Sequence, residues 1–414
     1  DRRQRQMCIR DRGYTNLGWT TEKGETEPEY SAGDTVKITK ATQFYAVRRK
    51  SNYYTVSYYL GNGSTNAAYQ KLTQTVEEGT VVTFAKVPAR TGYVNQGWSS
   101  KKNSEKATAK AKCTVNKNIT LYAVQKKAVQ LTFHRCDGST WQKTTLAKGS
   151  SYSLPGVRDA EGYTFMGWST KPMQSVSPQY EAEEKITVNG NVDLYAVVFN
   201  RTTETDLTED QLPQVDIYKY KQVIFVGDSR TEFMENVLTG MGESATKNVK
   251  FVCSAGKGLD WFTTTGWAQL YSIVQHDSNS ILSKKTAVIF NFGVNDLSKS
   301  ADYAEYYNWI APQLKSKGCE LYFMSVNPVN RLMLPNAGRA DRSEAAVRSF
   351  NQYMKANLSS AYTYIDMYSY LKSTGYSFAS DHYGTGTVDD GLHYTTRTYK
   401  RIFAKCMDSL RVPA

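Results

Sequence analysis

Apolar and polar residues follow different patterns in the two halves of the chain. Before residue 200, short segments such as 53–59 and 129–133 alternate apolar and polar residues or are rich in strand-forming types. This pattern predicts strands with one buried face. Pairs such as Asn62-Gly63 and Asn189-Gly190 predict the turns between them. The first half is therefore expected to be β-rich.

Beyond residue 216, apolar runs alternate with segments of helical spacing. Runs long enough for strands buried on both faces occupy residues 222–226, 287–292 and 321–326, and residues 362–366 form another candidate strand. Helical spacing follows at 233–241, 303–317, 347–358 and from about 396. This alternation predicts a doubly wound α/β domain with a parallel sheet, whose function lies at the carboxyl ends of the strands.

One motif recurs three times in the first half. Each copy has Gly-Tyr, then Gly-Trp, and later an aliphatic or aromatic residue followed by Tyr-Ala-Val. The spacing from the Trp to that Tyr is 26, 24 and 27 residues, which indicates a true internal repeat. The recurring Trp and Tyr are interpreted as core anchors of a small β module. A ligand-stacking aromatic platform is the alternative.

The motif resembles the internalin-type (Listeria–Bacteroides) B repeat, a β-grasp-like module common in bacterial surface proteins. The resemblance divides the first half into a partial repeat at 13–50 and two further repeats at 51–126 and 127–199. It implies a stalk or adhesive spacer and an extracellular or cell-wall-associated location. Residues 1–12 fit neither half and are interpreted as a truncated or non-native leader. We therefore expect a signal peptide to have been lost by truncation.

Charge is concentrated in the repeats. The chain carries a net charge of +12, and residues 1–200 hold 28 Lys and Arg against 17 Asp and Glu, compared with 23 against 22 in the remainder. The excess suits an anionic cell-wall polymer or glycan as a partner, although a merely solvated surface explains it equally well. No nucleic-acid-binding motif accompanies the basic residues, and no apolar stretch approaches the roughly 18 residues of a membrane span.

Chemistry is expected in the second half, after a polar linker at 200–215. There the first apolar run of the domain at 216–414 ends in Gly227-Asp228-Ser229, directly before a helical pattern. A serine on a tight turn from strand to helix has the geometry of a nucleophile, because backbone N–H groups at the helix N-terminus favour negative charge.

A second cluster, Asp389-Asp390-Gly391-Leu392-His393, stands just before the last predicted helix. The imidazole of His393 can take a proton from a serine hydroxyl, and a carboxylate three residues away can hold the needed tautomer. Asp389 is the alternative to Asp390 in that role. Asp381 and His382 form another Asp-His pair, but adjacent side chains diverge, so a structural role is favoured for them.

Four segments in order resemble the SGNH/GDSL hydrolase blocks: Gly227-Asp228-Ser229, residues 254–258, Gly293-x-Asn295-Asp296 and Asp390-x-x-His393. The resemblance implies a flavodoxin-like α/β/α fold and ester hydrolysis, often of acyl groups on carbohydrates, without a metal or organic cofactor. It also implies the roles of individual residues, which are Ser229 as nucleophile, His393 as general base and acid, Asp390 as its orienting carboxylate, and the Ser229 N–H, the Gly258 N–H and the Asn295 amide as the oxyanion hole.

Three neighbouring residues carry weaker hypotheses. Arg230 could bind an anionic group of the substrate or form a salt bridge in the wall of the site. Asp228 is expected chiefly to bond within the turn, with substrate contact as the alternative. Gly256 is the alternative to Gly258 as the donor from the second block, or a substrate contact.

The sequence therefore predicts a bacterial cell-surface serine esterase that removes O-acyl, most simply O-acetyl, groups from a carbohydrate. The alternatives are an O-acyltransferase acting on a polysaccharide and a surface adhesin without turnover. Deletion of residues 13–199 is expected to leave activity on soluble esters unchanged, because the repeats are assigned no chemistry.

Overall fold

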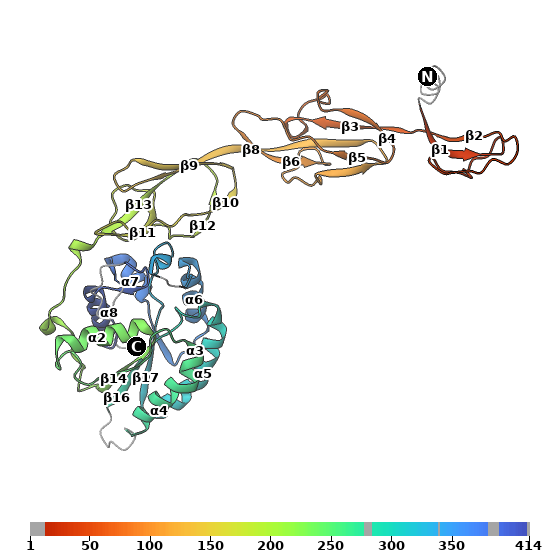
Figure 1. The fold of residues 1–414 in the computed structure, drawn as a ribbon. Coiled ribbons are helices and arrows are strands. Elements are labelled where there is room, and N and C mark those ends of the chain that lie inside the picture. Colours follow the sequence, from red (N-terminus) through yellow and green to blue (C-terminus); the bar gives the residue numbers. More distant parts are fainter. Residues whose placement is uncertain (1–12, 277–283, 338–339, 380–388, 412–414) are drawn as a thin grey trace. The chain divides into compact units, whose positions relative to one another are not determined.

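The computed structural model describes residues 13–276, 284–337, 340–379 and 389–411 (Figure 1). Its contacts divide the chain into two compact units. The first comprises Asp1–Val129 with Leu146–Lys148, and the second comprises Gln130–Thr145 with Gly149–Ala414. The third repeat and the C-terminal domain therefore belong to one unit.

The first unit contains two repeats built from antiparallel pairs. Strand β1 pairs with β2, β3 with β4, β5 with β7, and β6 with β8, while β3 also runs parallel to β8. The core of the second repeat gathers Val56, Tyr58, Trp98 and Leu121. The strands are β1 (Tyr14–Thr20), β2 (Tyr45–Lys50), β3 (Tyr53–Tyr59), β4 (Gln74–Glu77), β5 (Thr80–Thr83), β6 (Tyr93–Ser99), β7 (Lys112–Val115) and β8 (Ile119–His134).

The third repeat repeats this arrangement in the second unit. Strand β11 pairs antiparallel with β13, β13 runs parallel to the end of β8, and β10 pairs with β12. These pairings match those of β6, β8, β3, β5 and β7 in the second repeat. The strands are β9 (Thr140–Ala147), β10 (Ser150–Ser153), β11 (Tyr163–Ser169), β12 (Lys185–Val188) and β13 (Val192–Asn200).

The Gly-Trp step of the motif is a β-bulge. The strand register shifts just before each motif glycine, and Gly167 has a φ of +142°, which favours glycine. A Cβ at Gly167 would lie 2.5 Å from the Tyr180 carbonyl oxygen. The bulge turns Trp168 into the core, where its indole N–H donates to the Pro155 carbonyl at 2.8 Å.

The prediction that the motif aromatics are core anchors is confirmed for only some of them. Trp98 and Trp168 are buried, whereas Trp19 of the shortened first copy is 37% exposed. Tyr122 and Tyr195 are only half-buried, because the preceding Leu and following Ala point into the core. Successive residues of a strand face opposite sides, so the motif tyrosine points away from the core.

The C-terminal domain is built on a five-stranded parallel sheet in the order β15-β14-β16-β17-β18. This is the flavodoxin-like order, and its switch point lies between β14 and β16. The predicted fold class is confirmed. The strands are β14 (Tyr220–Gly227), β15 (Val249–Cys253), β16 (Lys285–Asn291), β17 (Cys319–Met324) and β18 (Tyr362–Ile365).

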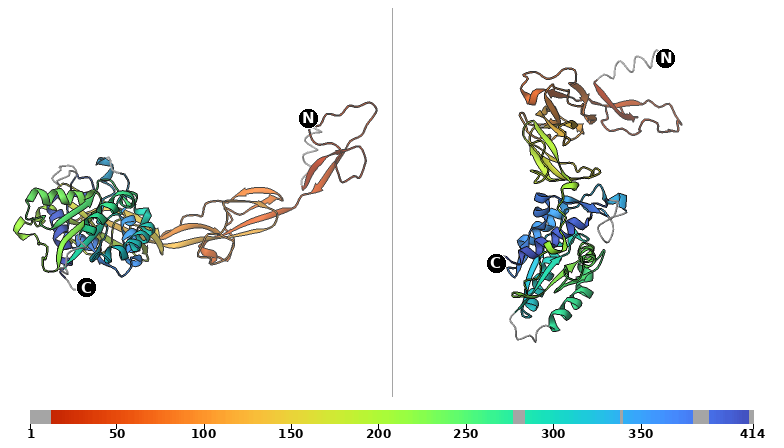
Figure 2. Two further views of the ribbon diagram at one scale, coloured as in Figure 1. Left: turned by 90° about the horizontal axis from the view of Figure 1, so that it is seen from below. Right: turned by 90° about the vertical axis from the view of Figure 1, so that its left-hand side faces the viewer.

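Helices cover both faces of this sheet (Figures 1 and 2). Val223 and Phe225 of β14 pack with α2 and α8, whereas Ile224 and Val226 pack on the other face with α4 and α5. Burial of alternate residues on opposite faces explains the continuous apolar run. The helices are α2 (Ser229–Met241), α3 (Leu259–Trp261), α4 (Trp267–His276), α5 (Ser300–Lys315), α6 (Glu344–Asn357), α7 (Met367–Thr374) and α8 (Thr396–Ser409), and the short strands β19 (Phe378–Ala379) and β20 (His393–Tyr394) pair with each other.

The segment predicted as a linker packs against the C-terminal domain. Glu204 is buried, accepts hydrogen bonds from Ser377 and Thr398, and forms an ion pair with Arg401. Leu212 and Val215 join the core beneath α2 and α8. In the described part of the chain, no helix has the length and apolar character needed to cross a membrane.

Candidate active site

Ser229 stands where β14 turns directly into α2. Asp228 caps the helix, its side chain accepting a hydrogen bond from the Arg230 N–H at 3.0 Å. A Cβ on Gly227 would lie 2.0 Å from the Thr231 hydroxyl oxygen and 2.8 Å from the Asn291 carbonyl oxygen, so only glycine fits this turn. The local sequence thus presents Ser229 at the carboxyl end of the sheet and at a helix N-terminus, as predicted.

The structure brings Ser229, His393 and Asp390 together. His393 Nε2 lies 2.9 Å from Ser229 Oγ, and His393 Nδ1 lies 2.6 Å from Asp390 Oδ2. An ionised carboxylate only accepts hydrogen bonds, so Nδ1 carries the proton and Nε2 is left to accept from the serine hydroxyl. All three residues are nearly inaccessible to solvent. This arrangement has the connectivity of a Ser-His-Asp triad.

The surroundings of Asp390 favour its charged form. Burial acts to raise the pKa of this carboxyl, but the hydrogen bond and charge of His393 and two backbone N–H groups outweigh burial and hold the pKa below its usual value. Those N–H groups, of Leu392 and His393, donate to Oδ1 at 2.8 and 2.7 Å. The ring of Phe233, one helical turn after Ser229, packs on His393 with a centroid separation of 4.2 Å.

Asp389 is not the carboxylate that contacts the imidazole. Its Oδ1 accepts from the Gly391 N–H at 3.0 Å, and its Oδ2 pairs with Arg201 at 2.5 Å. Gly391 has a φ of +66°, and a Cβ there would lie 2.4 Å from the Asn330 carbonyl oxygen, so the loop requires glycine. Asp381 and His382 lie outside the described residues.

The second and third predicted blocks meet at Asp296. Its Oδ2 accepts from the Leu259 N–H at 2.9 Å, and Gly258 packs so closely that a Cβ would lie 2.3 Å from that oxygen. Asn295 Nδ2 donates to the Lys257 carbonyl at 2.8 Å, which leaves its second hydrogen for another acceptor. Gly256 is exposed with open space around it. Donation of the Gly258 N–H, or of the Gly256 N–H in its place, and of the Asn295 amide to an oxyanion stays a prediction.

Sequence reasoning missed Arg342. Its Nη2 donates to Asn295 Oδ1 at 2.7 Å and its Nε donates to the Val294 carbonyl at 2.6 Å. These bonds fix the orientation of the Asn295 amide, so that Nδ2 faces the second block. A lone arginine 47 residues further along the chain gives no sequence signal for this role.

The hypothesis that Arg230 binds the substrate does not fit the structure. Its side chain is buried, and its guanidinium donates to the carbonyls of Leu392, Asn327 and Pro328 at 2.8 to 3.0 Å. Arg230 therefore stabilises the backbone at Leu392, directly before His393. Asp228 is also buried, which raises its pKa to about 6, and it serves the turn. Among the described side chains, no cluster of His, Cys, Asp or Glu is arranged to hold a metal ion.

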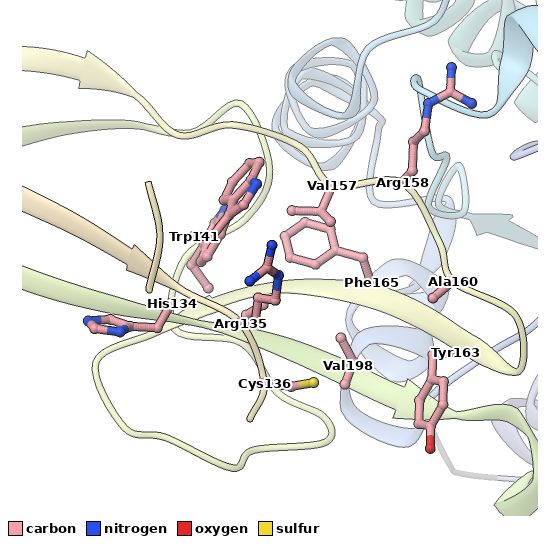
Figure 3. Close-up of a pocket in the computed structure, with 12 residues that line it drawn as sticks. His134, Arg135, Cys136, Trp141, Val157, Arg158, Ala160, Tyr163, Phe165 and Val198 are labelled. Atoms are coloured by element: carbon pink, nitrogen blue, oxygen red, sulfur yellow. The ribbon is translucent and has the colours of Figure 1, made fainter. Parts of the chain in front are cut away.

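A cavity of about 200 Å³ lies apart from this site, in the third repeat (Figure 3). Its walls are aromatic: Trp141 stacks on Trp168 with a centroid separation of 5.9 Å, and Phe165 packs against Trp168. Trp141 is 40% exposed, so its ring is open to a ligand. Arg135 and Arg158 add positive charge to the lining.

Two protein families match the chain. Residues 54–124 and 130–197 match the Listeria–Bacteroides repeat domain. Residues 223–406 match the GDSL-like lipase/acylhydrolase family. The predicted resemblances and the predicted ester-hydrolase class of the C-terminal domain are therefore confirmed.

Similar whole proteins are more distant. Two proteins of Evansella cellulosilytica, named as a Gly-rich membrane protein and a membrane protein, are 28% and 25% identical over 186 and 185 residues. Each match covers 44% of this chain but only 20% and 26% of the relatives' length.

Among solved structures, an acetyl xylan esterase matches with 11% identity and a TM-score of 0.32, covering 46% of this chain and 99% of its own. The catalytic domain of a Streptococcus pneumoniae peptidoglycan O-acetyltransferase matches with 16% identity and a TM-score of 0.29. That match covers 47% of this chain and 94% of the domain.

Proposed function

We propose that this chain is a cell-surface serine esterase, because residues 223–406 match the GDSL-like lipase/acylhydrolase family and Listeria–Bacteroides repeats precede them. The observation that carries the proposal is the continuous chain of hydrogen bonds from Ser229 through His393 to Asp390. Its substrate is an O-acyl, most simply O-acetyl, ester of a carbohydrate.

Acylation begins when His393 Nε2 removes the hydroxyl proton of Ser229. The serine oxygen attacks the ester carbonyl carbon and forms a tetrahedral intermediate with a negatively charged oxygen. Asp390 stabilises the imidazolium that results and keeps its ring in place. Collapse of the intermediate expels the sugar hydroxyl, which takes its proton from His393 Nε2, and leaves the acyl group on Ser229.

Deacylation repeats these steps with water as the nucleophile. His393 takes a proton from the water, the acyl group leaves as a carboxylic acid, and the Ser229 hydroxyl is restored. The backbone N–H groups of Ser229 and Gly258 and the amide of Asn295 are assigned to the oxyanion in both steps. Loss of one such donor typically costs about 3–4 kcal/mol of transition-state stabilisation.

The carbohydrate substrate and the surface location rest on features outside the triad. The basic repeats and the open Trp141 ring beside Arg135 suit an anionic glycan, since aromatic faces pack on sugar rings and guanidinium groups pair with carboxylates or phosphates. The names of the Evansella relatives as membrane proteins agree with a place at the cell envelope.

Turnover of p-nitrophenyl acetate by the full chain tests the esterase. We expect hydrolysis well above background, and its loss in Ser229→Ala, because the Ser229 hydroxyl contacts His393 Nε2 and is the proposed nucleophile. Ser151→Ala, on the exposed strand β10, is the matched control and should keep full activity. Hydrolysis that survives in Ser229→Ala would refute the assignment. Transfer of the acyl group to an added sugar, seen by mass spectrometry, would instead identify an acyltransferase.

Retention on an acidic, O-acetylated polysaccharide tests the partner. Trp141→Ala removes the open wall of the cavity and should weaken binding of the full chain, while Trp309→Ala should not, although Trp309 on α5 is even more exposed. Equal retention of both variants and the wild type would remove the binding role from the third repeat.

A further inference from the structure

The third repeat contacts the loop that carries Asp390. Arg201, the first residue after β13, donates from its Nη2 to Asp159 Oδ2 at 2.7 Å and to Asp389 Oδ2 at 2.5 Å. Its Nε donates to the Thr164 hydroxyl at 2.9 Å. The side chains of Asp159, Asp389 and Arg201 are only 1%, 12% and 19% exposed. Hydrogen bonds between a guanidinium and carboxylates are short and geometrically specific.

A second path joins the same two segments. Asp159 Oδ1 accepts from the Phe165 N–H at 2.9 Å and from Asn330 Nδ2 at 2.8 Å. The Asn330 N–H in turn donates to the Gly391 carbonyl at 2.8 Å. Asp159 of the repeat is thus connected to the Gly391 peptide of the C-terminal domain through a single intermediate residue.

The two paths close into a ring, since Asp389 Oδ1 accepts from the Gly391 N–H. The hydrogen bonds form a ring through Asp159, Arg201, Asp389, Gly391 and Asn330. Asp390 is the residue between Asp389 and Gly391 in the sequence. Asp390 therefore has both neighbouring residues tied to the third repeat, while its own carboxylate faces His393.

We propose that Arg201 and Asp159 are positioning residues, which hold the Asp389–Gly391 loop so that Asp390 orients His393. This inference rests on the proposed esterase and extends it, because it makes the third repeat a working part of the catalytic unit.

Electrostatics explains why this ring of hydrogen bonds needs the positive charge of Arg201. Burial, together with the nearby charge of Asp389, raises the pKa of Asp159 to about 7, and the charge of Arg201 offsets only part of this effect. Without Arg201, Asp159 would hold a proton more readily, and the charge-assisted hydrogen bonds that tie the Asp389 loop to the third repeat would be lost.

The ring changes one expectation from the sequence. Deletion of residues 13–199 was expected to leave activity on soluble esters unchanged, but that deletion removes Asp159 and Thr164 and exposes the Asp389 loop. The structure therefore predicts that the third repeat matters for turnover even of a substrate too small to touch it.

A double-mutant cycle on the full chain tests the proposal. Arg201→Gln and Asp389→Asn each weaken the ring, and we expect kcat for p-nitrophenyl acetate to fall about tenfold to a hundredfold with little change in KM. In the Asp390→Asn background the same changes should have little further effect, because residues that act through one group are not additive. Arg331→Gln is the matched control, since Arg331 also bridges the repeat to the domain, through Glu183 and Asp341.

The outcomes separate the two proposals. Wild-type kcat in folded Arg201→Gln and Asp389→Asn, or losses that simply add to that of Asp390→Asn, would overturn the positioning role alone. No turnover by the wild type would overturn the esterase and the inference with it. Thermal melts establish folding, and if Arg201→Gln does not fold, Arg201→Lys and Asp389→Asn decide. Arg201→Lys keeps the positive charge but loses the planar guanidinium with its several N–H donors, and it should give an intermediate kcat.

Discussion

Asp390 and His393, on the loop before α8, each make several contacts through the few polar atoms of their side chains. Asp390 accepts two backbone N–H groups on one oxygen and the imidazole on the other, so the carboxylate cannot rotate without losing a bond. Three residues on, His393 is packed under Phe233 and bonded to Ser229. Orientation of the imidazole is therefore built into the loop before any substrate binds.

Asp390→Asn should lower kcat by about four orders of magnitude, because an amide cannot stabilise the imidazolium and favours the wrong tautomer. Its effect on stability should depend on pH. The folded-state pKa of Asp390 lies below its unfolded value, so the charge stabilises the fold above that unfolded value, and this contribution is lost as pH falls through the folded pKa.

Urea unfolding from pH 3 to 7 measures this dependence. The stability difference between the wild type and Asp390→Asn should shrink at the acidic end, as pH falls through the folded pKa of Asp390. A difference independent of pH would mean that the carboxylate has no preferential stabilisation in the folded state.

The residues that the sequence could predict are those whose roles depend on local order. Ser229 follows a buried strand and precedes a helix, and Asp390 and His393 share one short loop, so local order made them candidates. The resemblance to the SGNH/GDSL blocks then implied their roles, with Asp389 open as the alternative to Asp390. Arg201 and Arg342 act on partners 188 and 47 residues away. Their pairings depend on the final packing of separate elements, and no periodicity or motif marks them. For Arg230 the sequence left a substrate contact and a salt bridge open, because the carbonyls that it binds lie far along the chain.

At the scale of elements, the repeat motif is explained by the backbone of its bulge. In the third repeat, β11 shifts register against β13 between Phe165 and Gly167, and Trp168 then enters the core. The sequence predicted that Trp168 is a core residue but not that the preceding glycine is obligatory, because backbone close approach is a property of the folded sheet.

Gly167→Ala should destabilise the third repeat by about 1–3 kcal/mol, because a Cβ would meet the Tyr180 carbonyl at 2.5 Å on a backbone that disfavours side chains. Gly190→Ala is the control, since that glycine has open space around it and should be nearly neutral. Chemical denaturation of the full chain measures both. Equal stability of the two variants would contradict the account of the bulge.

At the scale of the whole molecule, buried charges tie the third repeat to the C-terminal domain at a second place. Lys372 of α7 donates to the Met166 carbonyl at 2.8 Å and pairs with Glu181 and Glu344 at 2.8 and 3.1 Å. Burial acts to lower the pKa of Lys372, but the two carboxylates outweigh it and raise the pKa, so the ammonium stays charged. Such buried charges specify one docking geometry more than they add stability.

This docking could not be read from the sequence. The repeat boundaries and the polar composition of residues 200–215 predicted a linker between repeats and C-terminal domain, with no chemistry assigned to the repeats. Lys372, Arg201 and Glu204 each form an ion pair with a charged residue of a type that is common on surfaces, and only the burial of these pairs reveals the interface. The fold class can be predicted from the periodic spacing of apolar residues. The packing of the repeat on the domain depends on single side-chain pairs, which have no periodic spacing in the sequence.

Activation of Ser229 by His393 can be measured by peptide mass spectrometry after brief exposure of the full chain to a fluorophosphonate, which reacts with activated serines. We expect a covalent adduct on the peptide that contains Ser229, and we expect it to form far more slowly in His393→Ala. An unmodified Ser229 peptide, or labelling at the same rate in His393→Ala, would contradict this activation.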